Sequence, residues 1–428
     1  MTDYLAFPPV RGVHGAIVAP PSKSATNRAL LLAALGRQPV ELMRPLDSDD
    51  TLALARCLES MGAEIERTMG GLSVRGPLGR SGDREVVLDA GASGTAARFL
   101  AAIAAAVPGR YVLTGSDRLL ERPMAELVAA LRSAGAFVES VGREGFLPLA
   151  IAGGTLRSGT ISVDASRSSQ FLSALLLAAV AVEGGLSVRP QGPVVSAPYV
   201  DTTVEALEAF GHEVRRRPDG AIQVARGDVA PRTYDVPGDW SSSLPFFAAA
   251  GIAGGDVIVT GLSFPSRDAD AHAVEAVEAM GVEIERRAGS IHARGDRRRT
   301  KSTSVSARDF PDAVPALAAL SAHAEGESRF RDVAHLRLKE SDRLGGLVTL
   351  LEAAGANAFA REDELVVIGP LAAVGPTVRL PTFDDHRMAM AAALLSLRAR
   401  GTLIENPRCV AKSYSGFFRD LETILVRG

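Results

Sequence analysis

Four lysines stand out among the cationic residues, because the other 43 of the 47 basic residues are arginine. A lysine ammonium is compact and rotatable and has a tunable pKa, whereas the planar arginine fork suits fixed bidentate contacts. Lys23, Lys339 and Lys412 lie in the polar motifs PPSKSATNR, LKESDR and RCVAKSYSG, each just before a helical stretch. Lys301 lies in the polar run Arg297–Ser304 and is predicted to be a solvated loop charge. The other three lysines therefore indicate where chemistry is to be sought.

Several basic residues share a place at predicted strand-to-helix junctions. They are Lys23, Arg28, Arg122, Lys339, Arg343, Arg387 and Lys412. A helix N-terminus presents unpaired N–H groups and a positive dipole end, so it attracts anions and disfavours cations. Helix capping does not explain basic residues there, whereas a ligand with several negative charges does. Gly94, between Ser93 and Thr95, would let an oxyanion approach the backbone closely.

Three residues are candidates for proton transfer. Asp312 follows the segment ARDFP at a predicted helix start, where a capping role is equally open. Glu340 follows Lys339, and neighbouring cations should lower its pKa. His386 has charged neighbours on both sides, and structural and functional roles are equally open for it. The remaining acidic and hydroxyl residues of these junctions are interpreted as helix caps: Asp47–Asp50, Ser241 and Asp268.

Composition and missing motifs exclude several functions. The net charge is −3 and the sequence contains no long basic stripe, so nucleic acid is not an expected partner. Cys57 and Cys409 have neither disulfide nor metal spacing. No metal-ligand cluster, dinucleotide fingerprint, phosphate-binding loop or nucleophile elbow occurs. The N-terminus lacks the features of a secretory signal, and apolar runs such as Ala174–Val182 are too short to cross a bilayer, so a soluble cytoplasmic protein is expected.

An internal repeat predicts the elements that position these residues. Five segments show a helix end, a small residue, a glycine and then a two-strand hairpin. They begin at Met61, Ala134, Phe210, Met280 and Ala354, at intervals of 70 to 76 residues. That period is too long for a solenoid. Each unit is predicted to contain a strand, a buried Ala-rich helix such as Thr95–Val107, a second strand, an amphipathic helix and the hairpin.

A sixth unit opens at Thr377–Pro381 and has no hairpin of its own. The N-terminal segment YLAFPPVRG is otherwise unassigned, so we infer that it completes the sixth unit. Two domains of three units each follow, residues 21–237 and residues 238–428 together with 1–20. Two chain crossings, near residues 20–21 and 237–238, would form a hinge, and clefts between domains are common binding sites.

The motifs resemble, in order, those of the 5-enolpyruvylshikimate-3-phosphate synthase family. They are PSKSxTNR, SGTAAR, ERPM, SSQF, SxPYxDTT, PDA, KESDR, DDHRMAMA and CxAKS, and the match runs from about residue 14 to residue 420. The resemblance implies an α/β fold, the two-domain inverse α/β barrel of six βαβαββ units. It also implies transfer of the enolpyruvyl (1-carboxyvinyl) group of phosphoenolpyruvate to the 5-hydroxyl of 3-phosphoshikimate. Phosphate is released, on the route to chorismate and the aromatic amino acids.

Residue roles are implied by position in the family motifs. For 3-phosphoshikimate the implied contacts are Lys23, Ser24, Arg28, Ser168, Ser169, Gln170, Ser196, Asp312 and Lys339. For phosphoenolpyruvate they are Lys23, Gly94, Arg122, Gln170, Arg343, Arg387 and Lys412. The resemblance makes Asp312 the acceptor of the hydroxyl proton, and Glu340 with Lys23 the handlers of protons at the enol carbon and the leaving phosphate. It implies a tetrahedral intermediate, no cofactor, no metal and a monomer.

The chain departs from the family pattern at three positions. Ala92 replaces an asparagine two residues before the anion-loop glycine, which removes a donor beside phosphoenolpyruvate and bears on the response to glyphosate, the inhibitor that mimics it. His335 replaces the asparagine before the Lys-Glu pair, a contact to 3-phosphoshikimate. Ala197 replaces a lysine that often follows the serine of SxPY.

Two alternatives can be distinguished. A related family transfers enolpyruvate to UDP-N-acetylglucosamine and carries a cysteine in the loop that corresponds to Gly115–Arg122, which here contains none. A non-catalytic ring that encircles DNA would need basic inner helices, whereas the Ala-rich helices are almost uncharged. Salt-dependent DNA binding would identify such a ring.

Overall fold

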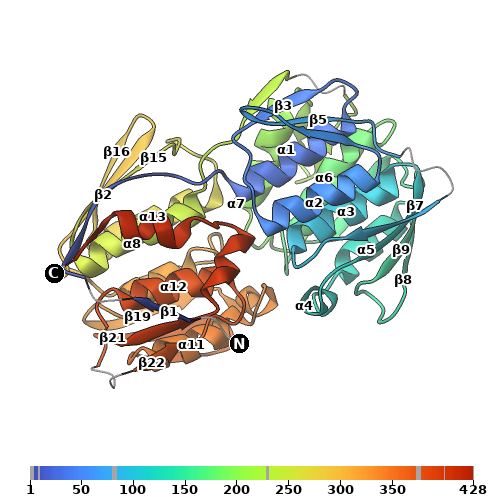
Figure 1. Cartoon of the computed structure of the whole chain (residues 1–428). Helices are drawn as coiled ribbons and strands as arrows, with labels where there is room; N and C mark the ends of the chain where they lie inside the picture. Colours follow the sequence, from blue (N-terminus) through green and yellow to red (C-terminus); the bar gives the residue numbers. More distant parts are fainter. Residues whose placement is uncertain are drawn as a thin grey trace. The chain divides into compact units, whose positions relative to one another are not determined.

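Two compact units make up the chain in this computed structural model, which describes residues 4–7, 10–79, 84–227, 231–372, 377–399 and 401–427. One unit combines Met1–Pro20 with Pro237–Gly428 and is called here the split unit. The other, Pro21–Val236, is the continuous unit. The chain therefore passes between the units twice, at Pro20–Pro21 and at Val236–Pro237 (Figure 1).

The continuous unit contains three four-stranded sheets of one design. In sheet order, the strands of the first sheet are β14 (Thr233–Asp235), β3 (Val40–Met43), β5 (Gly71–Arg75) and β4 (Glu64–Arg67). Those of the second sheet are β6 (Glu85–Asp89), β7 (Gly109–Thr114), β9 (Leu149–Gly153) and β8 (Phe137–Ser140). Those of the third sheet are β10 (Gly159–Asp164), β11 (Leu186–Gln191), β13 (Ile222–Val224) and β12 (Val214–Arg216). The first two strands of each sheet are parallel, and the predicted hairpin adds the antiparallel pair. The repeat thus builds one sheet per unit.

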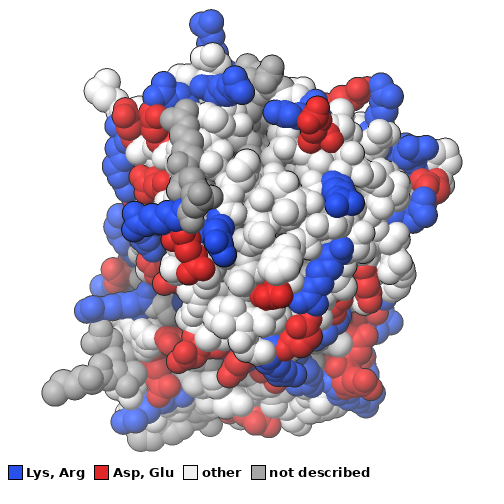
Figure 2. Space-filling model, turned by 90° about the vertical axis from the view of Figure 1, so that its right-hand side faces the viewer, with Lys and Arg blue, Asp and Glu red and all other residues white. Residues whose placement is uncertain are grey.

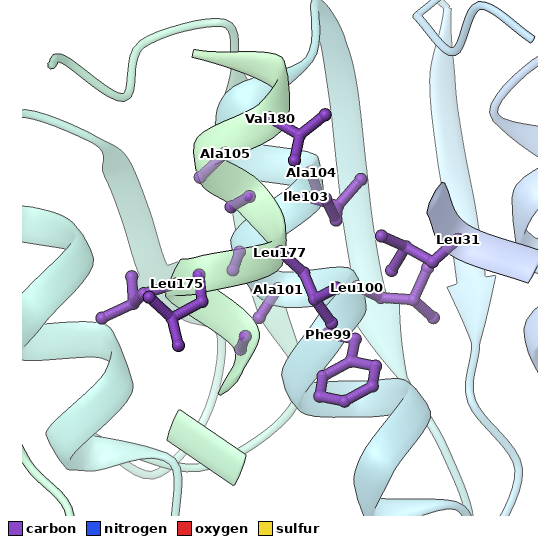
Figure 3. Close-up of a cluster of buried hydrophobic side chains, with 14 of the residues drawn as sticks. Leu31, Phe99, Leu100, Ala101, Ile103, Ala104, Ala105, Leu175, Leu177 and Val180 are labelled. Atoms are coloured by element: carbon purple, nitrogen blue, oxygen red, sulfur yellow. The ribbon is translucent and has the colours of Figure 1, made fainter. Parts of the chain in front are cut away.

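Two kinds of helix pack on these sheets. Inner helices are buried on nearly all sides: α1 (Lys23–Leu35), α3 (Gly94–Ala106) and α6 (Gln170–Ala178), which η1 (Ala179–Ala181) extends. Outer helices keep a polar face: α2 (Asp49–Ser60), α5 (Ala125–Ser133) and α7 (Pro198–Ala209), with the short α4 (Asp117–Leu120) before α5. The predicted Ala-rich helix Thr95–Val107 is confirmed as α3. Its alanines allow α3 and α6 to approach closely, while Phe99, Leu100 and Leu175 fill the space around them (Figure 3).

The split unit repeats this design. Its first sheet contains, in order, β16 (Glu283–Arg287), β17 (Ser290–Gly295), β15 (Gly255–Thr260), β2 (Gly12–Val18) and β24 (Leu425–Val426). The second contains β18 (Ser304–Ser306), β19 (Gly326–Arg331), β21 (Glu364–Gly369) and β20 (Asn357–Ala360). The third contains β1 (Tyr4–Phe7), β23 (Thr402–Glu405) and β22 (Val378–Leu380). Inner helices are α8 (Trp240–Ala253), α10 (Val314–Ser321) and α12 (His386–Ser396), which pack against one another. Outer ones are α9 (Ala273–Ala279) after η2 (Ala269–His272), α11 (Arg343–Ala353) after η3 (Ala334–Leu338), and α13 (Phe417–Thr423) after η4 (Pro407–Lys412).

The N-terminal strand completes the sixth sheet, as predicted. β1 pairs antiparallel with β23, which pairs parallel with β22. A second exchange lies where the chain passes between the units. β2 directly precedes α1 of the continuous unit yet pairs with β15 of the split unit, and β14 directly precedes α8 of the split unit yet pairs with β3 of the continuous unit. Each unit therefore closes a sheet with a strand whose following helix belongs to the other unit.

Glycine has two positional roles in the repeat. The glycines after the five hairpin-leading helices, Gly62 to Gly355, have φ between 79° and 107°, a left-handed helix end that other residues rarely adopt. At the far end of the hairpins, a Cβ on Gly76 or Gly295 would overlap a carbonyl oxygen of the inner helix, Ala34 or Ala250. Glycine there lets the hairpin strand lie directly against that helix.

The charged surface is mixed in sign. On the face in Figure 2, basic and acidic side chains are interspersed around a broad uncharged area. This distribution agrees with the net charge of −3 and with the expected lack of a basic stripe on that face.

A buried histidine predicts how the split unit responds to acid. Burial, and then the Arg398 charge, lower the pKa of His323 to about 3 from 6.5. Below pH 6.5 the unfolded chain binds the proton more readily, so stability falls as the pH drops from 6.5 towards 3. For this residue the loss between pH 7 and pH 5 is about 2 kcal/mol. Between pH 7 and pH 5, the free energy of unfolding of the variant His323→Gln should therefore fall by about 2 kcal/mol less than that of the parent protein.

Guanidinium unfolding of the parent and the variant at both pH values measures this effect. Trp240, the chain's only tryptophan, is buried in α8, so its fluorescence reports on the folding of the split unit. The exposed His272 of the same unit provides the control variant His272→Gln. Its free energy of unfolding should change between the two pH values by as much as that of the parent protein. An unchanged difference in His323→Gln would contradict the prediction.

Candidate functional site

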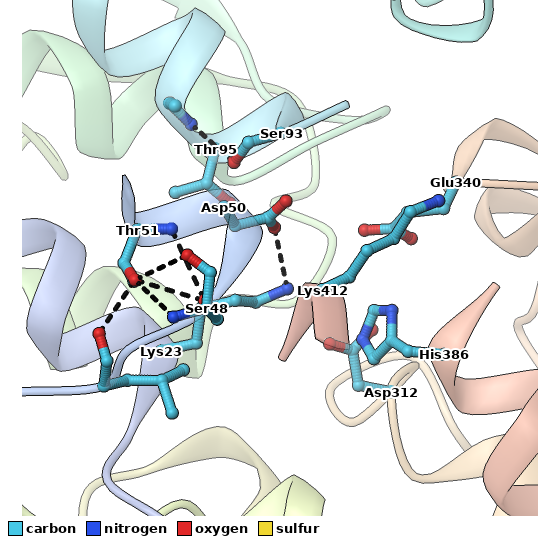
Figure 4. Close-up of polar contacts among 12 residues, drawn as sticks. Lys23, Ser48, Asp50, Thr51, Ser93, Thr95, Asp312, Glu340, His386 and Lys412 are labelled. Carbon is cyan, nitrogen blue, oxygen red and sulfur yellow. Dashed lines mark hydrogen bonds and ion pairs between the residues drawn. The ribbon is translucent and has the colours of Figure 1, made fainter. Parts of the chain in front are cut away.

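In the continuous unit, Lys23 is the first residue of α1 and pairs with an acid on α2. Its Nζ lies 3.1 Å from Asp50 Oδ2, and the two side chains are only 12% and 8% exposed (Figure 4). The side chain of Ser22 caps α1 by accepting from the Ala25 N–H. The cap of α2 is Ser48, so the interpretation of Asp47–Asp50 as a cap is confirmed for Ser48, whereas Asp50 is not the cap residue. Asp50 instead neutralises part of the positive charge at the start of α1.

Arg28, one turn further along α1, is almost fully buried and held in one orientation. Its Nε donates to Thr203 Oγ1 at 2.9 Å, Nη1 to the Ser24 carbonyl at 2.9 Å and Nη2 to the Tyr199 carbonyl at 3.1 Å. The guanidinium lies 5.3 Å from the centre of the Phe99 ring. These contacts fix the guanidinium between the start of α1 and that of α7.

The start of α3 gathers two further arginines around Gly94. A methyl group on Gly94 would overlap the guanidinium groups of Arg98 and Arg122, so both lie against this glycine. Arg98 Nη2 donates to the Pro123 carbonyl at 3.2 Å, and both arginines are buried. The backbone at Gly94 therefore faces two guanidinium groups, an arrangement suited to a phosphate or carboxylate.

The remaining predicted residues of this unit lie at the starts of α6 and α7. Gln170 Nε2 donates to Thr95 Oγ1 on α3 at 3.1 Å, which joins α6 to the Gly94 region. Ser168 and Ser169 immediately precede Gln170, and Ser169 is buried. Ser196 has φ = 57°, a left-handed conformation that is costly for serine and is often found at functional sites. The continuous unit thus brings its predicted residues to the starts of its inner helices and of α7.

In the split unit, Arg343 is completely buried and contacts three carboxylates. Nε and Nη2 donate to the two oxygens of Asp385, at 2.8 and 3.2 Å. Nη1 donates to Asp312 Oδ1 at 2.8 Å, and Nη2 also donates to Glu340 Oε2 at 2.8 Å. Burial opposes the charged form, but the charges of Asp385, Glu340 and Asp312 outweigh it and raise the pKa of Arg343. The guanidinium is a fixed cation.

Asp312 faces three cations. Besides Arg343, Lys339 Nζ lies 3.9 Å from Oδ1 and Arg387 Nη2 lies 3.8 Å from Oδ2. Burial alone would raise the pKa of Asp312, but Arg343, Lys339 and Arg387 together hold it well below its usual range. Ala313 is the N-cap residue of α10, so the alternative that Asp312 caps this helix is wrong.

Arg387 connects this cluster to the start of α8. Its guanidinium donates to Ser241 Oγ and, at 3.3 Å, to Ser242 Oγ. The cap of α8 is Asp239, which accepts from the Ser242 N–H, so the interpretation of Ser241 as a cap is wrong. The corresponding interpretation of Asp268 is confirmed, since its side chain caps η2.

Two further predicted residues lie near Asp385. His386 is buried, with Nδ1 3.7 Å from Asp385 Oδ1, and Lys412 Nζ donates to the Asp384 carbonyl at 2.5 Å. His335 is buried too, and its burial, followed by the Lys339 charge, lowers its pKa to about 3. His335 is therefore a neutral imidazole at physiological pH. The lowered pKa expected for Glu340 stays a prediction.

The two units differ in charge balance. In the continuous unit four cations, Lys23, Arg28, Arg98 and Arg122, lie at the helix starts, and Lys23 pairs with Asp50. In the split unit three carboxylates, Asp312, Glu340 and Asp385, accompany Arg343, Arg387, Lys339 and Lys412. The split unit therefore combines its cations with a group of carboxylates, whereas the named site residues of the continuous unit are mostly cations.

Sequence reasoning missed the roles of Asp385, Ser341 and Asp50. Asp385 caps α12 by accepting from the Arg387 N–H, as an acid before an apolar helix should, and it also binds Arg343 and Ser341. From the sequence alone it is only a charged neighbour of His386. The second set of contacts comes from packing α11 against α12, which a local pattern does not contain.

A membrane-spanning helix and a metal-binding group of side chains are both absent from the residues that the structure describes. None of the helices there combines the length and apolarity needed to cross a membrane. In the same ranges, no three His, Cys, Asp or Glu side chains are grouped to hold a metal ion.

Known proteins similar to this chain cover its whole length. The model of the family described as EPSP synthase (3-phosphoshikimate 1-carboxyvinyltransferase) matches residues 9–421. A protein of Vibrio atlanticus (strain LGP32) named 3-phosphoshikimate 1-carboxyvinyltransferase is 37% identical over 427 residues, 99% of each chain. A protein of the same name from Sulfurovum sp. (strain NBC37-1) is 36% identical over 98% of this chain and 99% of its own.

Solved structures show the same fold. EPSP synthase from Acinetobacter baumannii has a TM-score of 0.80 at 27% identity and covers 100% of this chain and 99% of its own. The enolpyruvyl transferase NikO from Streptomyces tendae has a TM-score of 0.78 at 19% identity, over 98% and 96% of the two chains. The fold class predicted from the sequence is therefore confirmed.

The buried Arg343 should be essential to the stability of the split unit. The variant Arg343→Gln would leave three carboxylates without their cation, and removing one partner of a buried ion pair costs about 3–5 kcal/mol. Guanidinium unfolding followed by Trp240 fluorescence measures the loss. The control is Arg294→Gln, whose pair with Glu283 is 4.0 Å long and largely exposed, and which should cost less than about 1 kcal/mol. Equal losses in the two variants would show that the carboxylates do not depend on Arg343.

Proposed function

The chain belongs to the EPSP synthase (3-phosphoshikimate 1-carboxyvinyltransferase) family, and from this premise we propose that it transfers the enolpyruvyl group of phosphoenolpyruvate to the 5-hydroxyl of 3-phosphoshikimate. The products are 5-enolpyruvylshikimate 3-phosphate and phosphate. One observation carries the proposal: cations gather at the helix starts of the continuous unit, and the split unit holds an ionised aspartate that is fixed by cations. Both proposed substrates carry phosphate and carboxylate groups.

The proposed contacts follow the geometry of each unit. Gly94 and Arg122 would take an anionic group of phosphoenolpyruvate, because a close backbone approach and a guanidinium meet there. Arg28, Ser24 and the serines before Gln170 would orient 3-phosphoshikimate. Lys23 would contact both substrates, and its ammonium would exchange Asp50 for substrate oxygen. Asp312 and Lys339 would contact 3-phosphoshikimate, and Arg343, Arg387 and Lys412 would contact phosphoenolpyruvate.

Proton transfers can be assigned to the side chains that have suitable charge states. Asp312 is ionised at neutral pH, which is the form that can accept the proton of the attacking 5-hydroxyl. The hydroxyl oxygen bonds to the second carbon of phosphoenolpyruvate, and Glu340 or Lys23 protonates the methylene carbon, which gives a tetrahedral ketal. Loss of a methyl proton then expels phosphate and restores the double bond. The surrounding cations stabilise the negative charge that develops on the phosphate.

The acceptor is the point on which the alternative function differs. Relatives named for the shikimate substrate cover the whole chain, and they support this acceptor over UDP-N-acetylglucosamine. The proposal keeps the expectations of a monomeric, cytoplasmic enzyme without a nucleic-acid partner.

A phosphate-release assay tests the function directly. Release should require phosphoenolpyruvate and 3-phosphoshikimate together, because neither substrate alone can form the ketal. Replacing 3-phosphoshikimate by UDP-N-acetylglucosamine is the control. Release with the sugar nucleotide but not with 3-phosphoshikimate would reverse the choice of acceptor, and release from phosphoenolpyruvate alone would contradict the mechanism.

Two arginine variants should separate the substrates. Arg122→Ala should raise KM for phosphoenolpyruvate by about tenfold or more, and Arg28→Ala should do the same for 3-phosphoshikimate, because each removes a charge-assisted contact worth about 1.5–3 kcal/mol. Steady-state kinetics with one substrate varied at a time give both values. The exposed Arg110 of β7 provides the control Arg110→Ala, which should leave both unchanged. Unchanged kinetics in either test variant would overturn that contact.

A further inference from the structure

A cavity in the continuous unit is separate from the proposed substrate contacts. It has a volume of about 360 Å³ and lies between α2, the hairpin β4–β5 and the segment that joins β3 to α2. A volume in this range can hold a small organic molecule. Its lining residues belong to neither proposed substrate set. The established family reaction therefore leaves this cavity without a role.

The cavity has an apolar interior. Leu30 of α1, which is 1% exposed, and Leu46 form buried parts of its wall. Leu52 of α2, Ile65 of β4 and Leu72 of β5 line it and are not fully buried, so they offer apolar surface to a ligand. Covering such surface favours a ligand with an apolar body by about 25 cal/mol per Å².

Charged residues at the rim favour an acidic group on that ligand. Of the three arginines that line the cavity, Arg67 pairs with Asp47 at 2.9 Å and Arg44 pairs with Asp235 at 3.1 Å. The lining also contains two carboxylates, Asp47 and Glu59, which leaves the three arginines with an excess of one positive charge. Arg56 is exposed on α2, one turn before the exposed Glu59, and forms no ion pair within the described residues. An exposed guanidinium beside an apolar wall can bind a carboxylate, since the bidentate geometry matches.

Hydrogen bonds connect the cavity wall to the start of α1. The Leu46 N–H donates to Thr26 Oγ1 at 3.0 Å, and Thr26 Oγ1 donates to the Ser22 carbonyl at 2.8 Å. Thr51, which also lines the cavity, donates through Oγ1 to the Leu46 carbonyl at 2.8 Å. Its neighbour Asp50 pairs with Lys23 (Figure 4). The wall and the Lys23–Asp50 pair are thus parts of one bonded segment.

We propose that this cavity binds a small carboxylic acid with an apolar body, and that the bound acid holds Lys23 on Asp50. A ligand stabilises the conformation to which it binds, and this cavity is formed in the conformation that has the Lys23–Asp50 pair. An occupied cavity therefore opposes the transfer of the Lys23 ammonium to a substrate anion. The binding site stands on the cavity alone, whereas the effect on Lys23 rests on the proposed function.

Calorimetric titration with 2-naphthoate tests the site. We expect saturable binding that the substrates do not displace, and weaker binding of the neutral analogue 2-naphthalenemethanol. Ala55, which lines the cavity on α2, gives the filling variant Ala55→Trp, which should weaken binding about tenfold or more. Ala129 on the exposed face of α5 gives the control Ala129→Trp, which should bind like the parent. Parental binding by Ala55→Trp, or displacement of 2-naphthoate by phosphoenolpyruvate or 3-phosphoshikimate, would overturn the site.

A charge variant tests the role of Arg56 without altering the interior. Arg56→Gln should weaken 2-naphthoate binding about threefold to fivefold, as expected for one exposed ionic contact, and should leave binding of 2-naphthalenemethanol unchanged. The exposed Arg110 provides the control Arg110→Gln. Equal affinities of the acid and its neutral analogue in the parent protein would overturn the assignment of an acidic ligand.

Kinetics test the link to Lys23. Saturating 2-naphthoate should raise KM for phosphoenolpyruvate about threefold or more in the parent protein and leave it unchanged in Ala55→Trp. Calorimetric binding with an unchanged KM would overturn the link and leave the binding site standing. A protein without the proposed activity would still give the calorimetric result, so failure of the function and failure of the site are distinguishable.

Discussion

The buried guanidinium of Arg343 is the interaction on which the split unit's site depends. One side chain without solvent exposure joins Asp385 at the start of α12, Glu340 before α11 and Asp312 before α10. Burying a lone charge costs several kcal/mol, so neither the cation nor the acids could occupy this position alone. The arrangement fixes Asp312 in its ionised form and in one orientation. The same ion cluster therefore keeps the proton acceptor ionised and holds it in place.

The repeated unit explains why charged groups meet at helix starts. Each unit sends a strand into a buried helix, so the helix N-terminus is the first place where polar side chains can follow an apolar run. Inner helices rich in alanine pack closely, as α3 does on α6, which draws their starts together. Within each of the two compact units, three copies of a simple layout thereby concentrate backbone N–H groups and cations.

The sequence was sufficient for the repeat, the inner helices and the closing strand β1, because each rests on local periodicity or on a count of strands. The predicted bounds at residues 20–21 and 237–238 separate β2 and β14 from the helices that follow them, but the sequence did not identify their partner strands, β15 and β3, because tertiary packing decides that pairing. The same limit applied to Asp50, Ser241 and Asp312. All three occupy positions typical of helix caps, and only tertiary packing places a buried lysine or arginine beside each one.

The charge balance of the two units divides their chemistry. Cations that gather around a backbone approach, as around Gly94, favour the binding of anions. The cluster around Asp312 adds carboxylates to its cations, so the cations both keep Asp312 ionised and hold it in one orientation. Separating the functions lets the same short motifs serve both, with the lysines as the adjustable members. Lys23 illustrates this, because its ammonium pairs with the Asp50 carboxylate and could exchange that carboxylate for a substrate anion.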